Sequence, residues 1–412
     1  MENLLSYVAR AGQQSLTELP LNEVDLAAFS QLVYVPMDEI ARPHEHQSLA
    51  EASQALTGYE EKTKLYEIFL RKRLELLHTM ASAPRWADLR LSGYVNERSL
   101  EDEKQFCAMT LWLPDGSRAI AFKGTDASLV GWKEDFNMSF ESPVSAQQAA
   151  VGYLHTAAAV DDAPLTLLGH SKGGNLAIWA AAFCDDAVRG RIQSVHSFDG
   201  PGLMDSDTQT AGYVALGERI HSYLPQGSLV GILMNQHKPY RVVKSRALSV
   251  FQHDLFSWEV EAEAPRFISM EELSRTSRIM DETLDEWLHG MSLEERRLFC
   301  DSVYGVLTAG NLETLTDLVS PDLQSAKRML HAMRDLDPHT RSMMGQVFRA
   351  LLSGTVGSAL SAIKQTVLEL LPGVANKQEE KEPPEALQPS LPTTLPKKAL
   401  PLASTERFRS FT

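Results

Sequence analysis

The residues best suited to chemistry in this chain form the hexapeptide Gly169-His170-Ser171-Lys172-Gly173-Gly174. Gly-x-Ser-x-Gly is typical of a nucleophile elbow, a tight turn that carries a serine hydroxyl between a strand and a helix. The apolar run Leu165 to Leu168 precedes the turn and the small-residue run Asn175 to Phe183 follows it, as the motif requires. The glycines leave room for the backbone and the helix to pass closely. We therefore predict that Ser171 is a nucleophile and that His170 supports the turn.

A serine hydrolase also needs hydrogen-bond donors for the charge that develops on the substrate oxygen. The amide of Lys172 follows the serine directly and is the usual first donor. A second donor is expected in Ile120 to Asp126, where an apolar strand runs into Gly124 and Thr125 and the backbone can approach a ligand closely. We expect the Lys172 side chain to point into solvent, so that only its amide takes part. The alternative is a cation that favours an anionic ester.

The general base is expected late in the chain, because a Gly-x-Ser-x-Gly elbow is followed along the chain first by the acid and then by the histidine of its triad. His253 follows the last strand candidate and is predicted to be this base, with His237 as the alternative. The histidines that lie within predicted elements are expected to be structural: His155, His196 and His221.

Two sets of motifs carry a resemblance to known families. Phe122-Lys123-Gly124-Thr125, followed by Trp132 and Asp135, resembles a segment of class 3 lipases. That resemblance implies that Thr125 completes the oxyanion hole and that the catalytic histidine lies shortly before a tryptophan, here Trp258. The opening NLLSYV and the later SFDGPG, LPQGSLVG and QHDLFSW resemble a narrower bacterial group, the Mbeg1-like proteins, over roughly residues 1–310. This second resemblance implies an α/β-hydrolase fold without a settled substrate.

The acid of the triad is where the chain departs from the lipases. Class 3 lipases carry it after the next-to-last strand, and the matching segment Leu224 to Val230 has Ser228 but no carboxylate. One interpretation moves the acid to Asp199, after the strand where pancreatic-type lipases carry theirs. Asp205, Asp207 and Asp254 are weaker candidates. The other interpretation is an incomplete triad.

Strand-like and helix-like runs alternate over residues 91–260, which predicts an α/β fold, a mostly parallel sheet with helices on both faces. The expected strands are Phe106 to Leu113, Arg118 to Phe122, Leu165 to Leu168, Ser194 to Phe198, Ile220 to Tyr223 and Tyr240 to Val243. The expected helices of this core are Gln147 to Val160 and Asn175 to Phe183.

The flanking regions divide the chain into further parts. Residues 1–90 are expected to form an N-terminal helical part of the hydrolase domain, before its core at 91–260. Residues 261–371 are expected to be helical, with capping boxes at Ser269 with Glu272 and at Ser292 with Glu295. The Pro-rich residues 372–412 predict a disordered tail.

Composition limits the classes of partner. A net charge of −15 over 412 residues argues against nucleic acid as a main partner. The three cysteines have no ligand spacing, so we expect free buried thiols, no metal and no organic cofactor. There is no secretory signal and no apolar run of membrane-spanning length, which predicts a cytoplasmic protein. Peripheral membrane contact through Ala350 to Leu371 is an alternative. The sequence does not indicate an oligomeric state.

Together these patterns predict a serine hydrolase, lipase- or esterase-like, that cleaves a carboxylic ester of a small molecule or lipid. Ser171 would attack, His253 would transfer the proton, Asp199 would orient His253, and the amides of Thr125 and Lys172 would bind the oxyanion. The alternative is a slow or non-catalytic relative that serves as an interaction scaffold. The missing carboxylate near Ser228 and the Pro-rich tail favour that alternative.

Overall fold

The computed structural model describes residues 2–42, 45–59, 68–126, 128–234, 236–279, 290–311 and 323–341, apart from 337 and 339. The chain divides into a unit Met1–Thr366 and a unit Val367–Thr412, and the described residues all belong to the first. The predicted tail at 372–412 and the segment Ala350 to Leu371 therefore lie outside the described residues.

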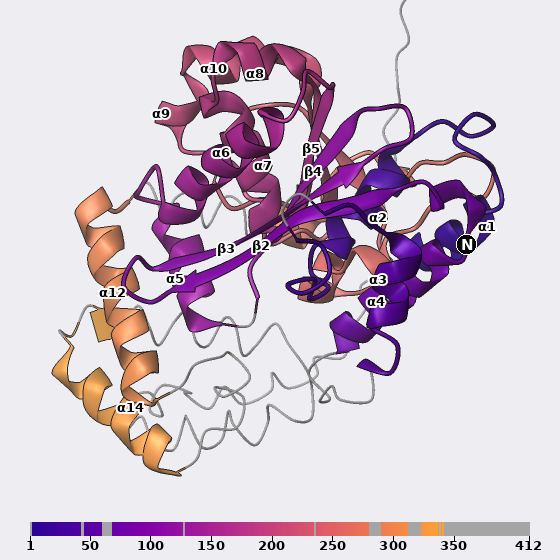
Figure 1. Cartoon of the computed structure of the whole chain (residues 1–412). Helices are drawn as coiled ribbons and strands as arrows, with labels where there is room; N and C mark the ends of the chain where they lie inside the picture. Colours follow the sequence, from indigo (N-terminus) through magenta and orange to yellow (C-terminus); the bar gives the residue numbers. More distant parts are fainter. Residues whose placement is uncertain are drawn as a thin grey trace, which may run out of the picture. The chain divides into compact units, whose positions relative to one another are not determined.

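A mixed sheet runs through the described part of the chain, with its nine strands adjacent in sequence order (Figure 1). The strands are β1 (Gln47–Ser48), β2 (Arg90–Ser99), β3 (Lys104–Trp112), β4 (Arg118–Phe122), β5 (Leu165–His170), β6 (Ile192–Phe198), β7 (Ile220–Pro225), β8 (Tyr240–Val243) and β9 (Ser269–Met270). Strands β4 to β8 are parallel, and the outer pairings are antiparallel. The sheet is thus parallel at its centre, and the short turn between β3 and β4 joins an antiparallel pair.

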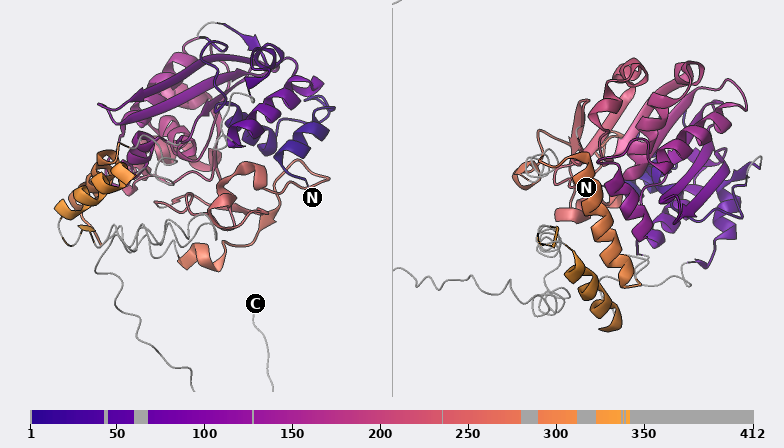
Figure 2. Two further views of the ribbon diagram at one scale, coloured as in Figure 1. Left: turned by 90° about the horizontal axis from the view of Figure 1, so that it is seen from below. Right: turned by 90° about the vertical axis from the view of Figure 1, so that its left-hand side faces the viewer.

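Helices cover both faces of the sheet, as predicted (Figure 2). Along β3, Cys107 and Met109 face the N-terminal helices, whereas Phe106 and Ala108 face the opposite layer, because side chains alternate along a strand. The N-terminal layer contains α1 (Leu4–Ala11), α2 (Glu23–Leu32), α3 (Leu49–Ala55) and α4 (Ile68–Ala81). The opposite layer contains α6 (Ser145–Ala158), α7 (Lys172–Phe183) and α10 (Ala211–Leu216), with the short α8 (Asp186–Arg191) and α9 (Asp205–Thr208) nearby. These two layers and the sheet form the α/β-hydrolase fold.

The region predicted to be helical from residue 261 begins differently. Ser269 is the first residue of β9 and pairs with Val243, so the capping box predicted for Ser269 and Glu272 is wrong. The exposed edge of β8 supplies backbone partners that the local sequence does not reveal. The second predicted capping box is confirmed, because the hydroxyl of Ser292 accepts from the amide of Glu295 at the start of α12 (Leu293–Ala309).

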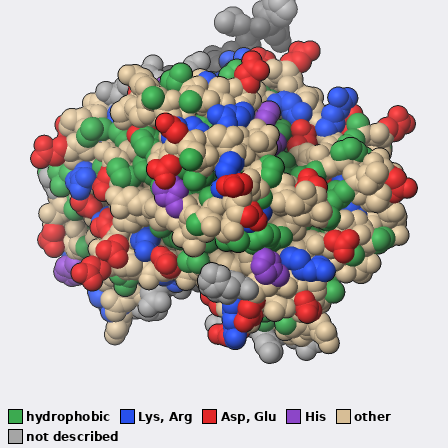
Figure 3. Space-filling model, turned by 45° about the horizontal axis from the view of Figure 1, so that its top comes forward, with side chains coloured by type: hydrophobic (Ala, Val, Ile, Leu, Met, Phe, Trp, Pro, Cys, Tyr) green, Lys and Arg blue, Asp and Glu red, His purple; other side chains and the backbone are tan. Residues whose placement is uncertain are grey.

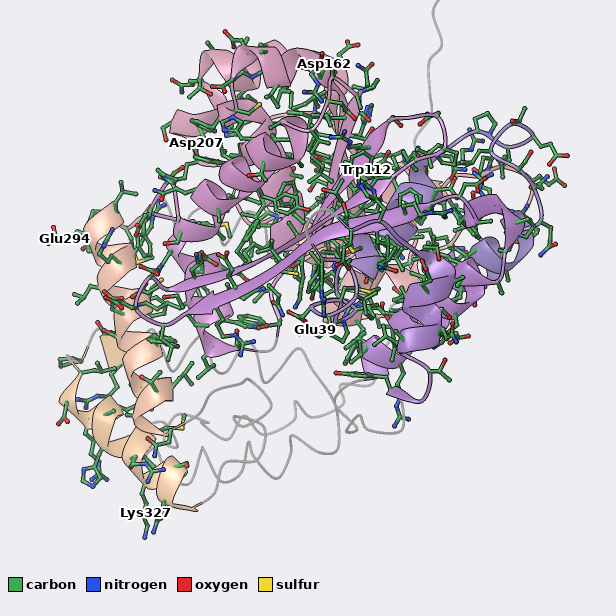
Figure 4. All side chains as sticks on the ribbon, viewed as in Figure 1. Glu39, Trp112, Asp162, Asp207, Glu294 and Lys327 are labelled. Atoms are coloured by element: carbon green, nitrogen blue, oxygen red, sulfur yellow. The ribbon has the colours of Figure 1, made fainter. Side chains whose placement is uncertain are left out.

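Helix α12 packs against α5 (Leu129–Asn137), the helix that follows the predicted oxyanion loop. Leu129 and Leu307 are buried together, and Lys133 of α5 forms an ion pair with Asp301 of α12 at 2.8 Å. Helix α14 (Leu323–Asp335) packs in turn on α12. Figure 4 labels Glu294 on α12 and Lys327 on α14. The described C-terminal helices therefore support the loop beside the elbow.

The cysteines and the surface of the protein complete the description of the fold. The cysteines are buried free thiols, as predicted: Cys107, Cys184 and Cys300. On the face shown in Figure 3, acidic and basic side chains are interspersed with apolar ones. None of the helices in the described ranges is long and apolar enough to cross a membrane.

A buried ion pair connects the N-terminal helices. Arg85 donates to Asp25 of α2 at 2.5 Å, and both side chains are fully buried. Arg85 also donates to the carbonyl of Leu19 at 2.6 Å. Burial raises the pKa of Asp25, while the guanidinium of Arg85 lowers it, so the charge of this carboxylate depends on its partner. The pair thereby anchors α2, which packs on β4, β5 and β6.

Arg85→Met should therefore lower the free energy of unfolding by about 3 kcal/mol, because it leaves Asp25 buried without a cation. Urea denaturation measures this loss. Arg42→Met is the matched control, since Arg42 pairs with Glu39 at the surface and its loss should cost less than about 1 kcal/mol. Equal losses in the two variants would contradict the role given to Arg85.

Candidate active site

Ser171 occupies the turn between β5 and α7 in a conformation that few side chains adopt. Its φ is 59° and its ψ is −137°, a region that costs on the order of 1–3 kcal/mol for a residue other than glycine. The amide of Ser171 donates to the carbonyl of Phe198 at 3.0 Å, which ties the turn to the end of β6. The predicted strand–turn–helix context is thus present, and the surrounding structure maintains the strain.

The glycines of the elbow permit close contact between elements. A Cβ at Gly169 would overlap the backbone of Gly173, and a Cβ at Gly173 would overlap the carbonyl oxygen of Phe122. A Cβ at Gly174 would overlap the side chain of Ser197. These three positions let α7 start directly against β4 and β6, and this start determines where the serine lies.

His253 and Asp199 meet beside this turn. The Nδ1 atom of His253 lies 2.7 Å from Oδ2 of Asp199, whose side chain is fully buried. The other carboxylate oxygen, Oδ1, accepts from the hydroxyl of Ser228 at 2.5 Å and from the amide of Gly231 at 3.1 Å. Because Oδ1 is occupied by these donors, Oδ2 is the oxygen available to the imidazole.

The two positions considered for the acid lie together in space. Ser228 stands in the segment where the lipase resemblance predicts the acid, and its hydroxyl donates to Asp199 from the end of the neighbouring strand. Asp199 has a φ of 49°, a left-handed conformation that aspartate tolerates better than most residues. The carboxylate is thus close to the segment matching the lipase acid, although it comes from a different strand.

His170 contacts the loop of the predicted base. Its Nε2 atom lies 2.8 Å from the backbone oxygen of His253, and its Nδ1 atom lies 3.1 Å from the hydroxyl of Tyr34. The rings of His170 and His253 are 4.4 Å apart between centroids. Burial, and to a smaller extent the charge of His253, lowers the pKa of His170 well below its usual range. His170 is therefore a neutral imidazole.

His253 contacts His170, the residue before Ser171, but no hydrogen bond joins it to Ser171 within the described residues. Within the described ranges, no hydrogen bond involves the hydroxyl oxygen of Ser171. The imidazole of His253 is 26% exposed, so solvent and ligands can reach it. Hydrogen bonds between nucleophile and base are often long in free enzymes and shorten on substrate binding.

The predicted oxyanion loop lies against the elbow. A Cβ at Gly124 would come within 2.7 Å of the Cβ of Ser171. The amide of Gly124 donates to the hydroxyl of Tyr34 at 2.9 Å, whereas the amide of Thr125 makes no hydrogen bond within the described residues. The hydroxyl of Thr125 donates to the carboxylate of Asp135 at 2.6 and 2.7 Å. The Thr125 amide is thus an unoccupied donor of the loop among the described residues, and the amide of Lys172 is unpaired by position in the first turn of α7.

The expectation that the Lys172 side chain points into solvent is wrong. Its side chain is 1% exposed, and its ammonium group donates to Glu134 at 2.9 Å and to two oxygens of Gln105 at 2.8 Å. Glu134 also accepts from the amide of Ala146 at 2.8 Å. A buried ammonium needs such partners to remain charged. Lys172 therefore links the helix after the nucleophile to α5, and its charge is directed away from solvent.

The weaker candidates have other partners. The alternative base, His237, pairs with Asp205 at 2.8 Å. Of the other acid candidates, Asp207 accepts from Ser142 at 2.7 Å. Asp254 pairs with Lys72 at 2.8 Å. His196 stacks on His221, and His155 lies 3.5 Å from Asp185. None of these contacts involves Ser171. Across the ranges that the structure describes, no three His, Cys, Asp or Glu side chains are arranged to hold a metal ion.

Sequence reasoning assigned no role to Tyr34, Gln105 or Glu134. Tyr34 follows α2, and Gln105 and Glu134 lie on β3 and α5, all far from the elbow along the chain. The available signal was a polar residue within an apolar strand, which Gln105 provides in β3. That signal indicates a buried polar partner without saying which one.

The chain is similar to a known protein family and, at low sequence identity, to solved structures. A model of the Mbeg1-like family matches residues 80–305, more than half of the chain. A search of curated proteins found none that matches this chain. Similar solved structures include a mutant form of MDLA from Penicillium cyclopium, 11% identical over 61% of this chain and 88% of that one, with a TM-score of 0.36. Another is M37 lipase, 14% identical over 66% of this chain and 81% of that one, with a TM-score of 0.33.

Lys172→Met should lower the free energy of unfolding by about 3 kcal/mol, because Glu134 would remain buried without its cation. Adding Glu134→Gln should recover part of the loss, since it removes the stranded charge. Lys104→Met is the control on β3, where the lysine pairs with a half-exposed Glu97, and it should cost less than about 1 kcal/mol. Urea denaturation decides, and no recovery in the double variant would count against the buried pair.

The neutral His170 should also make stability depend on pH. Its lowered folded-state pKa means that the unfolded chain binds more protons as the pH falls through about 6.5, so the folded state loses stability there. His170→Gln removes this contribution. The variant's deficit relative to wild type should therefore be largest above pH 7 and shrink towards pH 5, measured by urea denaturation. A deficit that stays constant with pH would refute this reasoning.

Proposed function

We propose that this chain, which belongs to the Mbeg1-like family, is a lipase- or esterase-like serine hydrolase that cleaves carboxylic esters. The observation that carries the proposal is the hydrogen bond of 2.7 Å between His253 and the buried Asp199, next to the strained turn of Ser171. A buried carboxylate that holds one imidazole nitrogen leaves the other nitrogen as a general base. The likeness of Phe122 to Thr125 to a class 3 lipase segment supports an ester as the substrate.

The proposed reaction has two halves. The hydroxyl oxygen of Ser171 attacks the ester carbonyl while Nε2 of His253 takes the proton, and Asp199 stabilises the imidazolium. The amides of Thr125 and Lys172 donate to the oxyanion of the tetrahedral intermediate. Collapse of the intermediate breaks the bond to the alcohol, which leaves with the proton from His253. Water then hydrolyses the acyl-enzyme by the same steps and restores Ser171.

The burial of Lys172 bears on the charge of the substrate. Its charge is compensated by Glu134, so it does not favour an anionic ester over a neutral one. We retain a small-molecule or lipid ester as the substrate class. The absence of a cofactor, the cytoplasmic location and peripheral membrane contact stay predictions.

Labelling with a fluorophosphonate, together with hydrolysis of p-nitrophenyl butyrate, tests this function. Wild type should be labelled and hydrolyse the ester. Ser171→Ala and His253→Ala should lose labelling and lower kcat by about 10⁶-fold and at least 10⁴-fold. Asp199→Asn should lower kcat by about 10⁴-fold, because it disturbs the imidazole tautomer.

Ser228→Ala serves as a graded comparison, since it removes one donor from Asp199 and keeps the carboxylate. Its kcat should lie between those of wild type and Asp199→Asn. Folding of each variant is checked by circular dichroism. A folded wild-type protein that neither reacts with the probe nor cleaves esters would reject the enzyme and favour an interaction scaffold.

A further inference from the structure

One chain of hydrogen bonds joins the three segments that carry the proposed catalytic groups. The amide of Gly124 lies 2.9 Å from the hydroxyl oxygen of Tyr34, and this oxygen lies 3.1 Å from Nδ1 of His170. On the other side of the ring, Nε2 of His170 lies 2.8 Å from the backbone oxygen of His253. This series of hydrogen bonds thus runs from the oxyanion loop through Tyr34 and the elbow to the loop of the base.

The direction of each hydrogen bond follows from whether the atoms that it joins can donate or only accept a proton. The backbone oxygen of His253 can only accept, so Nε2 of His170 carries the proton and Nδ1 of the neutral ring accepts from Tyr34. The hydroxyl of Tyr34 also lies 3.3 Å from the backbone oxygen of His170, so both of its acceptors belong to the elbow residue. The oxygen of Tyr34 then accepts from the amide of Gly124. Burial raises the pKa of Tyr34 to about 12, which keeps its hydroxyl protonated. Every donor therefore points from the oxyanion loop towards His253.

Tyr34 is itself held by the N-terminal helical layer. The guanidinium of Arg73, on α4, lies 3.8 Å from the centroid of the Tyr34 ring. Arg73 also donates to the side chain of Gln31 on α2 at 3.0 Å. A cation over an aromatic face is attracted to it. The hydroxyl of Tyr34 is therefore presented to the elbow from a fixed position outside the hydrolase core.

The hydrogen bonds through Tyr34 and His170 hold groups that the proposed reaction needs. The Gly124 amide is occupied by Tyr34, whereas the neighbouring Thr125 amide has no hydrogen bond within the described residues. The bond from His170 holds the backbone of His253, while Asp199 holds its side chain. With both attachments in place, the partly exposed imidazole of His253 has little freedom to turn away from Ser171.

We propose that Tyr34 and His170 are positioning residues that hold the oxyanion loop and the base loop in register with Ser171. The inference rests on the proposed hydrolase function. Neither residue touches the reacting atoms, so both act through Gly124 and His253. Small displacements of such groups are expected to lower kcat, because catalysis depends on geometry in the transition state more than on substrate binding.

Tyr34→Phe, His170→Leu and the double variant test the proposal, with p-nitrophenyl butyrate as substrate and active sites counted by fluorophosphonate labelling. Each single variant should lower kcat per labelled site at least tenfold and leave KM within twofold. The double variant should lose no more than the worse single variant, because both changes break one chain. His170→Gln retains an N–H donor for the backbone of His253 and should recover part of the loss.

Tyr223→Phe is the matched control, because it removes another tyrosine hydroxyl that lies 3.3 Å from a histidine, His196, in the same sheet. It should keep kcat per labelled site within twofold of wild type. Equal kcat in Tyr34→Phe and Tyr223→Phe, or multiplying losses in the double variant, would overturn the proposal. A wild-type protein without labelling would instead reject the hydrolase itself, and the positioning role with it. Tyr34→Phe changes one atom, so the test stands even if His170→Leu fails to fold.

Discussion

The tight turn at Ser171 is the constraint on which the rest of this structure depends. Its positive φ is unfavourable by itself, and it persists because glycines let β4, β5, β6 and the start of α7 meet there in close contact. Gly169 and Gly173 make this contact feasible. Because the centre of the sheet is parallel, the carboxyl ends of β4, β5 and β6 lie at the same edge as this turn.

Several buried charged groups near this turn and in the N-terminal helices have specific partners. Lys172 is paired with Glu134, Asp199 receives donors from Ser228 and Gly231, and the more distant Arg85 is paired with Asp25. A buried ion pair adds little net stability, but losing one partner is costly. These interactions therefore fix which elements lie next to one another. They link α7 to α5, the segment after β7 to the end of β6, and α2 to the residues before β2.

The site is supported from regions outside the parallel core. The N-terminal helices present Tyr34 to the elbow, and α12 packs against α5, whose Asp135 accepts from Thr125. The two regions approach the oxyanion loop through different partners. The described helical segments thus have a structural relation to the proposed chemistry that their position in the sequence does not suggest.

The sequence by itself determined the features that depend on near neighbours. The spacing of glycines around Ser171, the strand Arg118 to Phe122 and the cap at Ser292 could be predicted, because sterics and capping act within a few residues. Tertiary structure decided the burial of Lys172 and the pairing of Ser269 with β8. Their partners lie about 25 or more residues away along the chain, and only packing of the sheet and helices brings such groups together.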